Sequence, residues 1–188
     1  MKRVLLLLFI ASASGSMCAI AEEVCKSTQL KNPAPTLSEI YAMAQASAKA
    51  WKPDVVATRV ANTSLGPLQP NGSAADWIVT FYSAAAKGNV AISTTRGTYR
   101  CWADADSPGR IPDLKADFLR DGAKLYALAK EHGAALLAQG YVVMIGTAAA
   151  PNTRHATWNI NYSKDNRNGN ILVIVDANTG AVEKVLKD

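Results

Sequence analysis

The sequence predicts an α+β fold made of two tandem repeats, each a helix followed by three antiparallel strands. The first observation is an internal similarity, because Ala75–Ser83 aligns with Ala156–Lys164 at an offset of 81 residues. The second is a glycine-asparagine turn after each of these segments, at Gly88-Asn89 and Gly169-Asn170. The third is a segment of helical periodicity before each of them. One supersecondary unit used twice explains all three, since a single unit buries too little apolar surface on its own.

The first repeat is predicted to begin with a helix. Thr36 and Glu39 have the spacing of a capping box, and apolar residues recur at helical spacing as far as Trp51. Pro53 ends this helix, because proline disfavours helical backbone in the residue before it. The first repeat spans residues 22–101, and its predicted strands are 55–61, 75–83 and 90–95.

The second repeat follows the same plan. Apolar residues from Leu114 to Leu136 recur at roughly helical spacing, with Gly122 and Gly133 as weak points. Asn168-Gly169 is typical of a two-residue hairpin, because both residue types tolerate positive φ. The connector is predicted at 102–112 and the second repeat at 113–188, with strands 141–147, 156–163 and 171–175 and a last short segment 181–186.

The N-terminal residues predict a signal peptide, residues 1–21. Lys2 and Arg3 precede the apolar run 4–10, and Ala19-Ile20-Ala21 has the small residues of a cleavage site. The apolar run is shorter than the roughly 20 residues that span a bilayer. We therefore expect a periplasmic or secreted protein without stable membrane insertion, whose mature chain begins at Glu22.

Cysteine number favours the same cleavage site. A cut after Ala21 leaves Cys25 and Cys101, an even number that can pair in an oxidising compartment. This disulfide would close the whole first repeat and stabilise it by about 4 kcal/mol on the chain-entropy model. A cut after Ala13 would also retain Cys18, and a lipid anchor at Cys18 is a minor alternative. A free catalytic thiol is the alternative to the Cys25–Cys101 pairing.

Charge argues against a nucleic-acid partner. Removing residues 1–21 from the 188-residue chain leaves 167 residues and lowers the net charge from +5 to +3. The mature chain has no long block of lysine and arginine, which a nucleic-acid patch requires.

The sequence contains no motif for catalysis, metal binding or cofactor binding. Its two histidines, His132 and His155, lie in no zinc-protease spacing, and no nucleophile elbow or Cys-x-x-Cys pair occurs. Residues 104–109 begin like a calcium loop, but Lys115 stands where a bidentate glutamate should close it. We therefore predict a protein that is not an enzyme and has no cofactor or metal. A hydrolase assembled from distant residues is a remaining alternative.

A series of features near the C-terminus resembles a known family. Trp158 is followed by the Asn168-Gly169 hairpin, an aliphatic strand, and a turn carrying Asp176, Thr179 and Gly180. This series is similar to the end of PepSY domains over residues 147–184. PepSY domains are small extracytoplasmic modules with a helix packed on an antiparallel sheet, known from propeptides of thermolysin-like peptidases. The resemblance implies a PepSY/cystatin-like fold.

The same resemblance implies inhibition or regulation of an extracytoplasmic partner and implies no reaction. The first repeat keeps only Gly97 of the family turn. Asp176, Thr179 and Gly180 also have a purely structural interpretation, because Asp and Thr bond nearby backbone and Gly supplies positive φ. The tandem layout is also similar to that of beta-lactamase inhibitor protein.

The predicted function is therefore an exported, non-enzymatic binding protein that inhibits or regulates an extracytoplasmic enzyme or toxin. The alternative is a carrier of a small apolar ligand held between helix and sheet. Aromatic residues and arginines dominate interface hot spots, so Trp102 with Arg100 and Arg110 is the candidate partner contact. The other three tryptophans are predicted to lie in the core: Trp51, Trp77 and Trp158.

Overall fold

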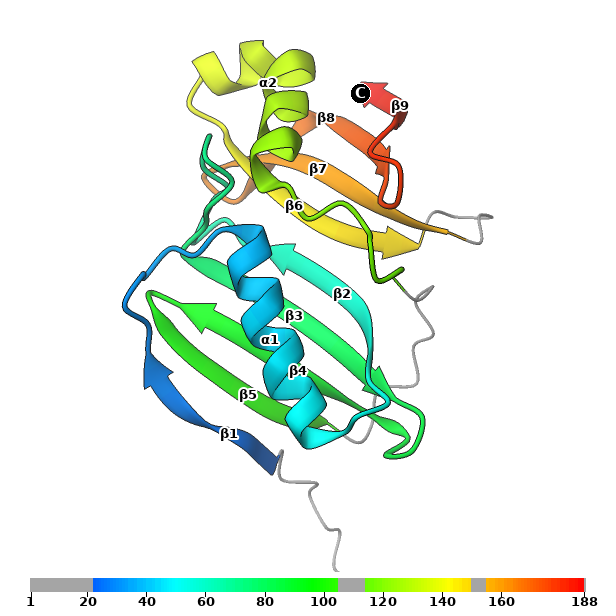
Figure 1. The fold of residues 1–188 in the computed structure, drawn as a ribbon. Helices are drawn as coiled ribbons and strands as arrows, with labels where there is room; N and C mark the ends of the chain where they lie inside the picture. The colour runs from blue at the N-terminus through cyan, green and yellow to red at the C-terminus, as the bar shows by residue number, and fades with distance from the viewer. Residues whose placement is uncertain (1–21, 105–113, 150–154, 188) are drawn as a thin grey trace, which may run out of the picture.

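The computed structural model describes residues 22–104, 114–149 and 155–187, which form one continuous nine-stranded antiparallel sheet (Figure 1). The strands run across the sheet in the order β1-β5-β4-β3-β2-β6-β7-β8-β9. Their bounds are β1 Glu22–Gln29, β2 Val56–Asn62, β3 Asp76–Ser83, β4 Gly88–Thr95, β5 Thr98–Asp104, β6 Val142–Ala149, β7 Ala156–Lys164, β8 Arg167–Asp176 and β9 Val182–Lys187. The helices are α1 (Leu37–Trp51) and α2 (Gly122–Ala138). The predicted signal peptide lies outside the described residues.

The predicted fold class, two tandem α-β-β-β repeats, is wrong. The molecule has a single sheet, because β2 and β6 pair with each other at its centre, where Ala61 lies opposite Gly146. The sequence pattern also missed β1 and β5, which extend the first half of the sheet. The physical reason is that β2 and β6 would each leave an unpaired strand edge in a separate repeat, and pairing them satisfies backbone groups of both. The hairpin turn predicted at Asn168-Gly169 is wrong, because Asp165 and Asn166 have the positive φ angles of the turn and Asn168 and Gly169 lie within β8.

Two side chains complete the seam between β2 and β6. The side-chain oxygen of Asn62 accepts a hydrogen bond from the Ile145 backbone N–H (2.6 Å), and its amide group donates to the Gly66 carbonyl (2.9 Å). The Thr147 hydroxyl oxygen accepts from the Val60 backbone N–H (2.9 Å). Asn62 is only 6% exposed. These side chains therefore take the place of ladder bonds that the backbones do not make here.

Replacing Asn62 by alanine is expected to lower the free energy of unfolding by about 2 kcal/mol, because it leaves the buried Ile145 N–H without a partner. Urea denaturation followed by tryptophan fluorescence measures the change. Asn161→Ala, at a half-buried position in β7, is the matched control and should change stability by less than about 0.5 kcal/mol. Equal losses in the two variants would contradict the role given to Asn62.

The first helix begins where the capping pattern predicts. The Thr36 hydroxyl accepts from the Glu39 backbone N–H (3.3 Å), and the Thr36 N–H donates to the Glu39 carboxylate (2.8 Å). These reciprocal bonds satisfy two N–H groups that a helix start leaves free. α1 thus presents Ile40 and Tyr41 to the sheet, where both are buried.

The second helix begins later than the apolar spacing predicts. It starts at Gly122, where the Asp121 carboxylate accepts from the Lys124 backbone N–H (3.0 Å). Leu114 and Phe118 have helical spacing and are buried, but they lie in the segment before the helix. That segment is held by backbone bonds to the sheet side, including Leu114 N–H to the Ala57 carbonyl (3.1 Å). Burial of side chains from this non-helical segment, which contains a turn, therefore produced a pattern that resembles helical spacing.

Both helices lie on the same face of the sheet, and one core lies beneath them (Figure 1). Phe118 joins its two halves: its ring meets Tyr41 of α1 edge-on at 5.0 Å and lies 6.1 Å from the Trp158 ring of β7. The Arg120 guanidinium lies over the Tyr41 ring at 4.9 Å, a favourable cation–π contact. The halves therefore share buried surface as well as a sheet.

The tryptophans of β3 and β7 occupy equivalent core positions. Trp77 donates its indole N–H to the Pro35 carbonyl before α1, and Trp158 donates to the Leu119 carbonyl before α2, both at 3.0 Å. Both side chains are fully buried. Each tryptophan thus fixes the segment that leads into the helix above it. This shared role explains why the two tryptophans align in the sequence repeat.

Gly133, predicted as a weak point of the second helix, marks a close approach. A Cβ atom there would lie 2.2 Å from the Tyr162 ring, and the backbone leaves helical geometry at this residue. The Tyr162 hydroxyl donates to the Ala129 carbonyl of α2. Burial raises the pKa of Tyr162 to about 12, so it stays protonated and keeps donating at neutral pH.

Candidate binding face of the sheet

The face of the sheet opposite the helices is not covered by any element of the described chain, and we call it the open face. Side chains alternate along each strand, so residues that flank core positions project from this face. For example, the Tyr99 hydroxyl bonds to Ser47 of α1 (2.7 Å), and the next residue in β5 points away. Cross-strand pairs place one row of open-face residues over eight strands: Arg100, Ser93, Ile78, Ala61, Gly146, Asn159, Ile174 and Lys184.

Two of the three predicted contact residues lie on the open face. Trp102 and Arg100 alternate along β5 with Tyr99 and Cys101, which are buried on the helix side. Trp102 is half-buried and Arg100 is exposed. Arg110 lies outside the described residues. Arg100 and Trp102 therefore lie side by side on one strand of the open face, and their contact with a partner stays a prediction.

The register adds two residues to this group that sequence reasoning missed. Trp102 of β5 pairs with Ala91 of β4, and Ala91 pairs with Thr80 of β3. Thr80 in turn pairs with the exposed Arg59 of β2, so Trp102 and Arg59 stand at the two ends of one cross-strand row. Tyr82 of β3 lies beside that row and pairs with Val56. A period-two pattern identifies which residues leave the core, but only the register shows which of them are neighbours. We call Arg59, Tyr82, Arg100 and Trp102 the aromatic-basic patch.

The other half of the open face is more apolar. Met144 of β6 pairs with Asn161, Asn161 pairs with Leu172 of β8, and Leu172 pairs with Leu186 of β9. Where the two halves meet, the open face is shallow, because Ala61 has only a methyl side chain and Gly146, opposite it, has none. The open face therefore combines a basic, aromatic side, a low centre and an aliphatic side.

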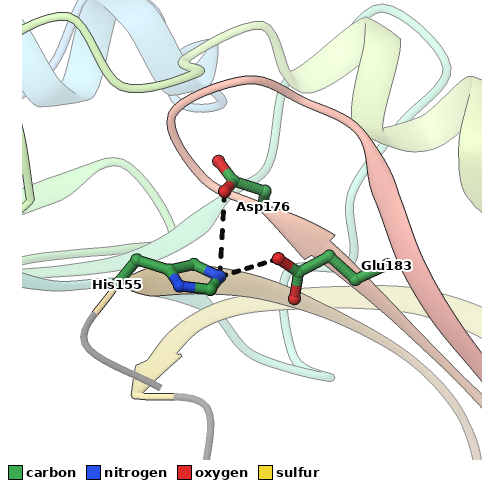
Figure 2. Close-up of side chains that lie close together, drawn as sticks. All are labelled: His155, Asp176 and Glu183. Atoms are coloured by element: carbon green, nitrogen blue, oxygen red, sulfur yellow. Dashed lines mark hydrogen bonds and ion pairs between the residues drawn. The ribbon is translucent and has the colours of Figure 1, made fainter.

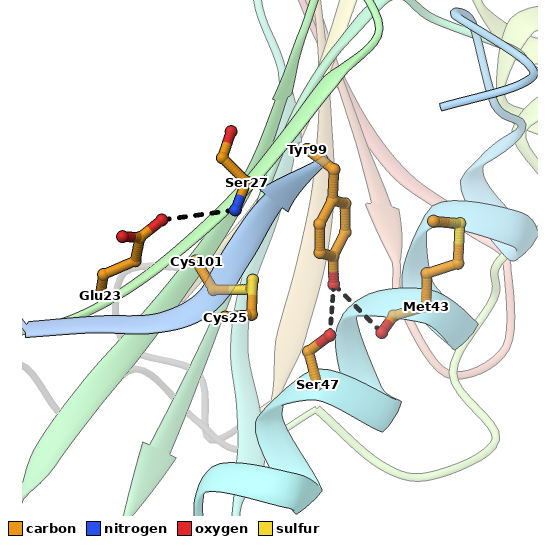
Figure 3. The surroundings of a disulfide bond; sticks show 7 residues. All are labelled: Glu23, Cys25, Ser27, Met43, Ser47, Tyr99 and Cys101. Atoms are coloured by element: carbon orange, nitrogen blue, oxygen red, sulfur yellow. Dashed lines mark hydrogen bonds between the residues drawn. A yellow bond between two sulfur atoms is a disulfide. The ribbon is translucent and has the colours of Figure 1, made fainter. Parts of the chain in front are cut away.

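The predicted disulfide is present, on the helix side of the strand that carries two patch residues. Cys25 of β1 and Cys101 of β5 lie opposite each other, with Cα atoms 5.3 Å apart (Figure 3). The bond fixes β1 to the strand that carries Arg100 and Trp102. Disulfides persist in oxidising compartments, so this bond indicates an exported protein.

No helix in the described ranges combines the length and apolar character that crossing a lipid bilayer requires.

The turn that carries the family resemblance is held by its own side chain. One carboxylate oxygen of Asp176 accepts from the backbone N–H groups of Asn178 and Thr179, both at 2.7 Å. Gly180 has φ of +72°, a conformation that favours glycine. Burial opposes ionisation of Asp176, but these backbone bonds outweigh it and lower the pKa of its carboxyl below the usual value. The structural interpretation accounts for Asp176 and Gly180.

A second cluster of polar side chains lies at the end of the sheet near this turn. His155 precedes β7, Asp176 ends β8 and Glu183 lies in β9 (Figure 2). The His155 Nε2 atom lies 2.7 Å from a Glu183 carboxylate oxygen and 3.7 Å from the Asp176 Oδ2 atom. No short sequence motif predicts this group, because its three residues come from separate elements of the fold.

Two hollows on the surface lie outside the space between helix and sheet. One, of about 470 Å³, lies beside the start of α1 and includes Leu30, Pro35 and Met43 in its lining. The other, of about 410 Å³, lies along α2 and includes Pro70 and Tyr126.

No family model matches the chain, and no curated protein matches it. The fold is similar to a solved structure described as a "putative lipoprotein" from Clostridium difficile 630. The two share 16% sequence identity and superpose with a TM-score of 0.50, covering 79% of this chain and 92% of that chain. At this identity the likeness concerns the fold alone.

Proposed function

We propose that this chain is an exported, non-enzymatic binding protein that inhibits or regulates a protein partner in the periplasm or outside the cell. The observation that carries the proposal is the aromatic-basic patch on an uncovered sheet face. Tryptophan, tyrosine and arginine are the residue types that most often carry binding energy in protein interfaces. The resemblance of the C-terminal half to PepSY domains supports the same proposal.

The charge of the aromatic-basic patch indicates which charged groups a partner surface would present. Arg59 and Arg100 give the aromatic-basic patch a positive charge, and Glu23, opposite Trp102, lies at its border. Elsewhere on the open face Lys184 is positive, whereas Asp76 and Asp176 are negative. We therefore assign the partner as a protein that presents carboxylates around an apolar centre. Complementary charge would guide the encounter, and Trp102 and Tyr82 would supply the buried anchors.

The open face is large enough for such a partner. Its row of residues crosses eight strands, which at about 4.8 Å between strands is a width of about 34 Å. A standard interface buries about 800 Å² on each side, which a strip of this width provides over about seven residues of strand length at about 3.4 Å per residue. The disulfide-linked edge holds the patch in one arrangement, so little ordering is needed on binding.

The test is a comparison of variants in partner capture and affinity. Mature protein from Glu22 is used as bait on the native extracytoplasmic fraction, and retained proteins are identified by mass spectrometry. Binding of the captured protein is then measured for wild type and for Trp102→Ala/Arg100→Ala. We expect an affinity loss of about 100-fold, from two truncated contacts of about 1–2 kcal/mol each.

The matched control is Met43→Ala/Lys49→Ala, which removes an apolar and a basic side chain from the exposed side of α1. This variant should bind like wild type, and both variants should keep the wild-type melting temperature within about 3 °C. Binding should also weaken as salt rises, because it depends on exposed charge. Equal affinity of the two variants would contradict the proposal, as would release of a small molecule in place of any protein partner.

A further inference from the structure

We propose that His155, Asp176 and Glu183 form a binding site for a divalent transition-metal ion of the zinc type. Their ligand atoms, the imidazole nitrogen and one oxygen of each carboxylate, all lie within 4.8 Å of one another (Figure 2). Within the described ranges, no other set of three histidine, cysteine or acidic side chains meets this criterion. The site is separate from the aromatic-basic patch, so it does not depend on the proposed partner.

The donor set selects the kind of ion. One imidazole nitrogen and two carboxylate oxygens match Zn²⁺, which binds nitrogen and oxygen ligands in four-coordinate sites. Three protein ligands leave the fourth position to water. Ca²⁺ and Mg²⁺ take six or more ligands, all of them oxygen, so a histidine-centred group of three is a poor site for either. The two carboxylates also balance the charge of a divalent cation.

The distances require only small movements for an ion to enter. Zinc bonds of about 2.0–2.1 Å in a tetrahedral site place ligand atoms about 3.4 Å apart. The separations of His155 Nε2 from Glu183 and Asp176 are 2.7 and 3.7 Å, one on each side of that value. Shifts of less than about 1 Å in side chains that are 20–35% exposed satisfy both. The ion would then replace the His155–Glu183 hydrogen bond.

One ligand is already oriented by the backbone. The Asn178 and Thr179 N–H groups hold one Asp176 carboxylate oxygen, and the other, Oδ2, is the atom that lies towards His155. Bonds of this kind to the far side of a ligand fix its direction and raise metal affinity. The turn that resembles the PepSY motif thus has a second use, which is to aim a carboxylate.

The bound ion would fasten the last strand. His155 lies before β7, Asp176 at the end of β8 and Glu183 in β9, whose other long side pairs with no strand of the described chain. An ion shared by the three would hold β9 on the sheet through more than its hydrogen bonds to β8. Hydrogen exchange of the β9 amides should therefore slow when zinc is added.

The experiment is a zinc titration of full-length mature protein without a histidine tag, after chelator treatment. Isothermal titration calorimetry should show one ion per chain. The dissociation constant should rise by about 100-fold or more in His155→Ala and in Glu183→Gln, since losing a ligand costs at least as much as losing its supporting bond. His132→Ala removes the other histidine of the chain and should leave the zinc affinity unchanged.

Each alternative result overturns the proposal. Wild-type affinity in both His155→Ala and Glu183→Gln would place the zinc elsewhere, and so would a loss in His132→Ala. Absence of saturable binding by wild type at micromolar zinc would remove the site altogether. Ca²⁺ binding as tight as Zn²⁺ binding would contradict the assigned ion class. If His155→Ala does not fold, Glu183→Gln carries the comparison, because it keeps the size of the side chain.

Discussion

Replacing Phe118 by alanine is expected to lower the free energy of unfolding by about 4 kcal/mol. The side chain is 1% exposed and lies between Tyr41 of α1 and Trp158 of β7. Its removal leaves a cavity at the place where the cores of the two halves meet, and the neighbouring rings, held by α1 and the sheet, cannot close it. Urea denaturation followed by both fluorescence and far-ultraviolet circular dichroism measures the effect.

Phe118→Leu is the control for this prediction. Leucine fills most of the volume, so the loss should stay below about 1.5 kcal/mol. Wild type should unfold in a single transition by both probes, because the halves share one core. A loss below about 1.5 kcal/mol in Phe118→Ala, or two separate wild-type transitions, would contradict a core that runs through both halves.

Removing the disulfide in Cys25→Ala/Cys101→Ala is expected to cost about 4 kcal/mol of stability. The two cysteines are 76 residues apart in sequence, and the bond restricts the unfolded chain over that whole length. Cys101 is also 2% exposed and belongs to the core. The free energy of unfolding of the double variant, compared with oxidised wild type, gives the effect.

Reduced wild-type protein is the internal control, since it has the cysteines without the bond. It should unfold with nearly the same free energy as the double variant, and adding reductant should not change the double variant. A loss under about 1 kcal/mol would show that β1 can separate from β5 while the rest of the sheet stays folded. That result would contradict the view that the disulfide acts on the whole first half.

Sequence periodicity predicted which side chains enter the core and failed on which strands are neighbours. Trp77 and Trp158 are buried as predicted, because alternation with polar residues assigns one face of a strand to the core. Alternation does not indicate which strands pair in a sheet, so no local sequence feature predicted that Ala61 lies opposite Gly146. The prediction of separate repeats failed at this pair for that reason.

The same distinction applies to the candidate sites. Trp102 and Arg100 could be singled out because they are close in sequence and of residue types found in interfaces. Arg59 joined them only through the register of three strand pairs. His155 and Glu183 meet because β7 and β9 flank β8, and no motif spacing encodes that arrangement.

An open sheet of nine strands has two free edges, and each is a template on which another chain could add a strand and begin aggregation. This protein limits that risk at both ends of its sheet (Figure 1). Strand β1 carries the exposed charges Glu23 and Lys26, and its pairing with β5 is interrupted by two irregularities. Strand β9 is short and carries Glu183 and Lys184 side by side. A wide face is thus left available for recognition while the edges discourage self-association.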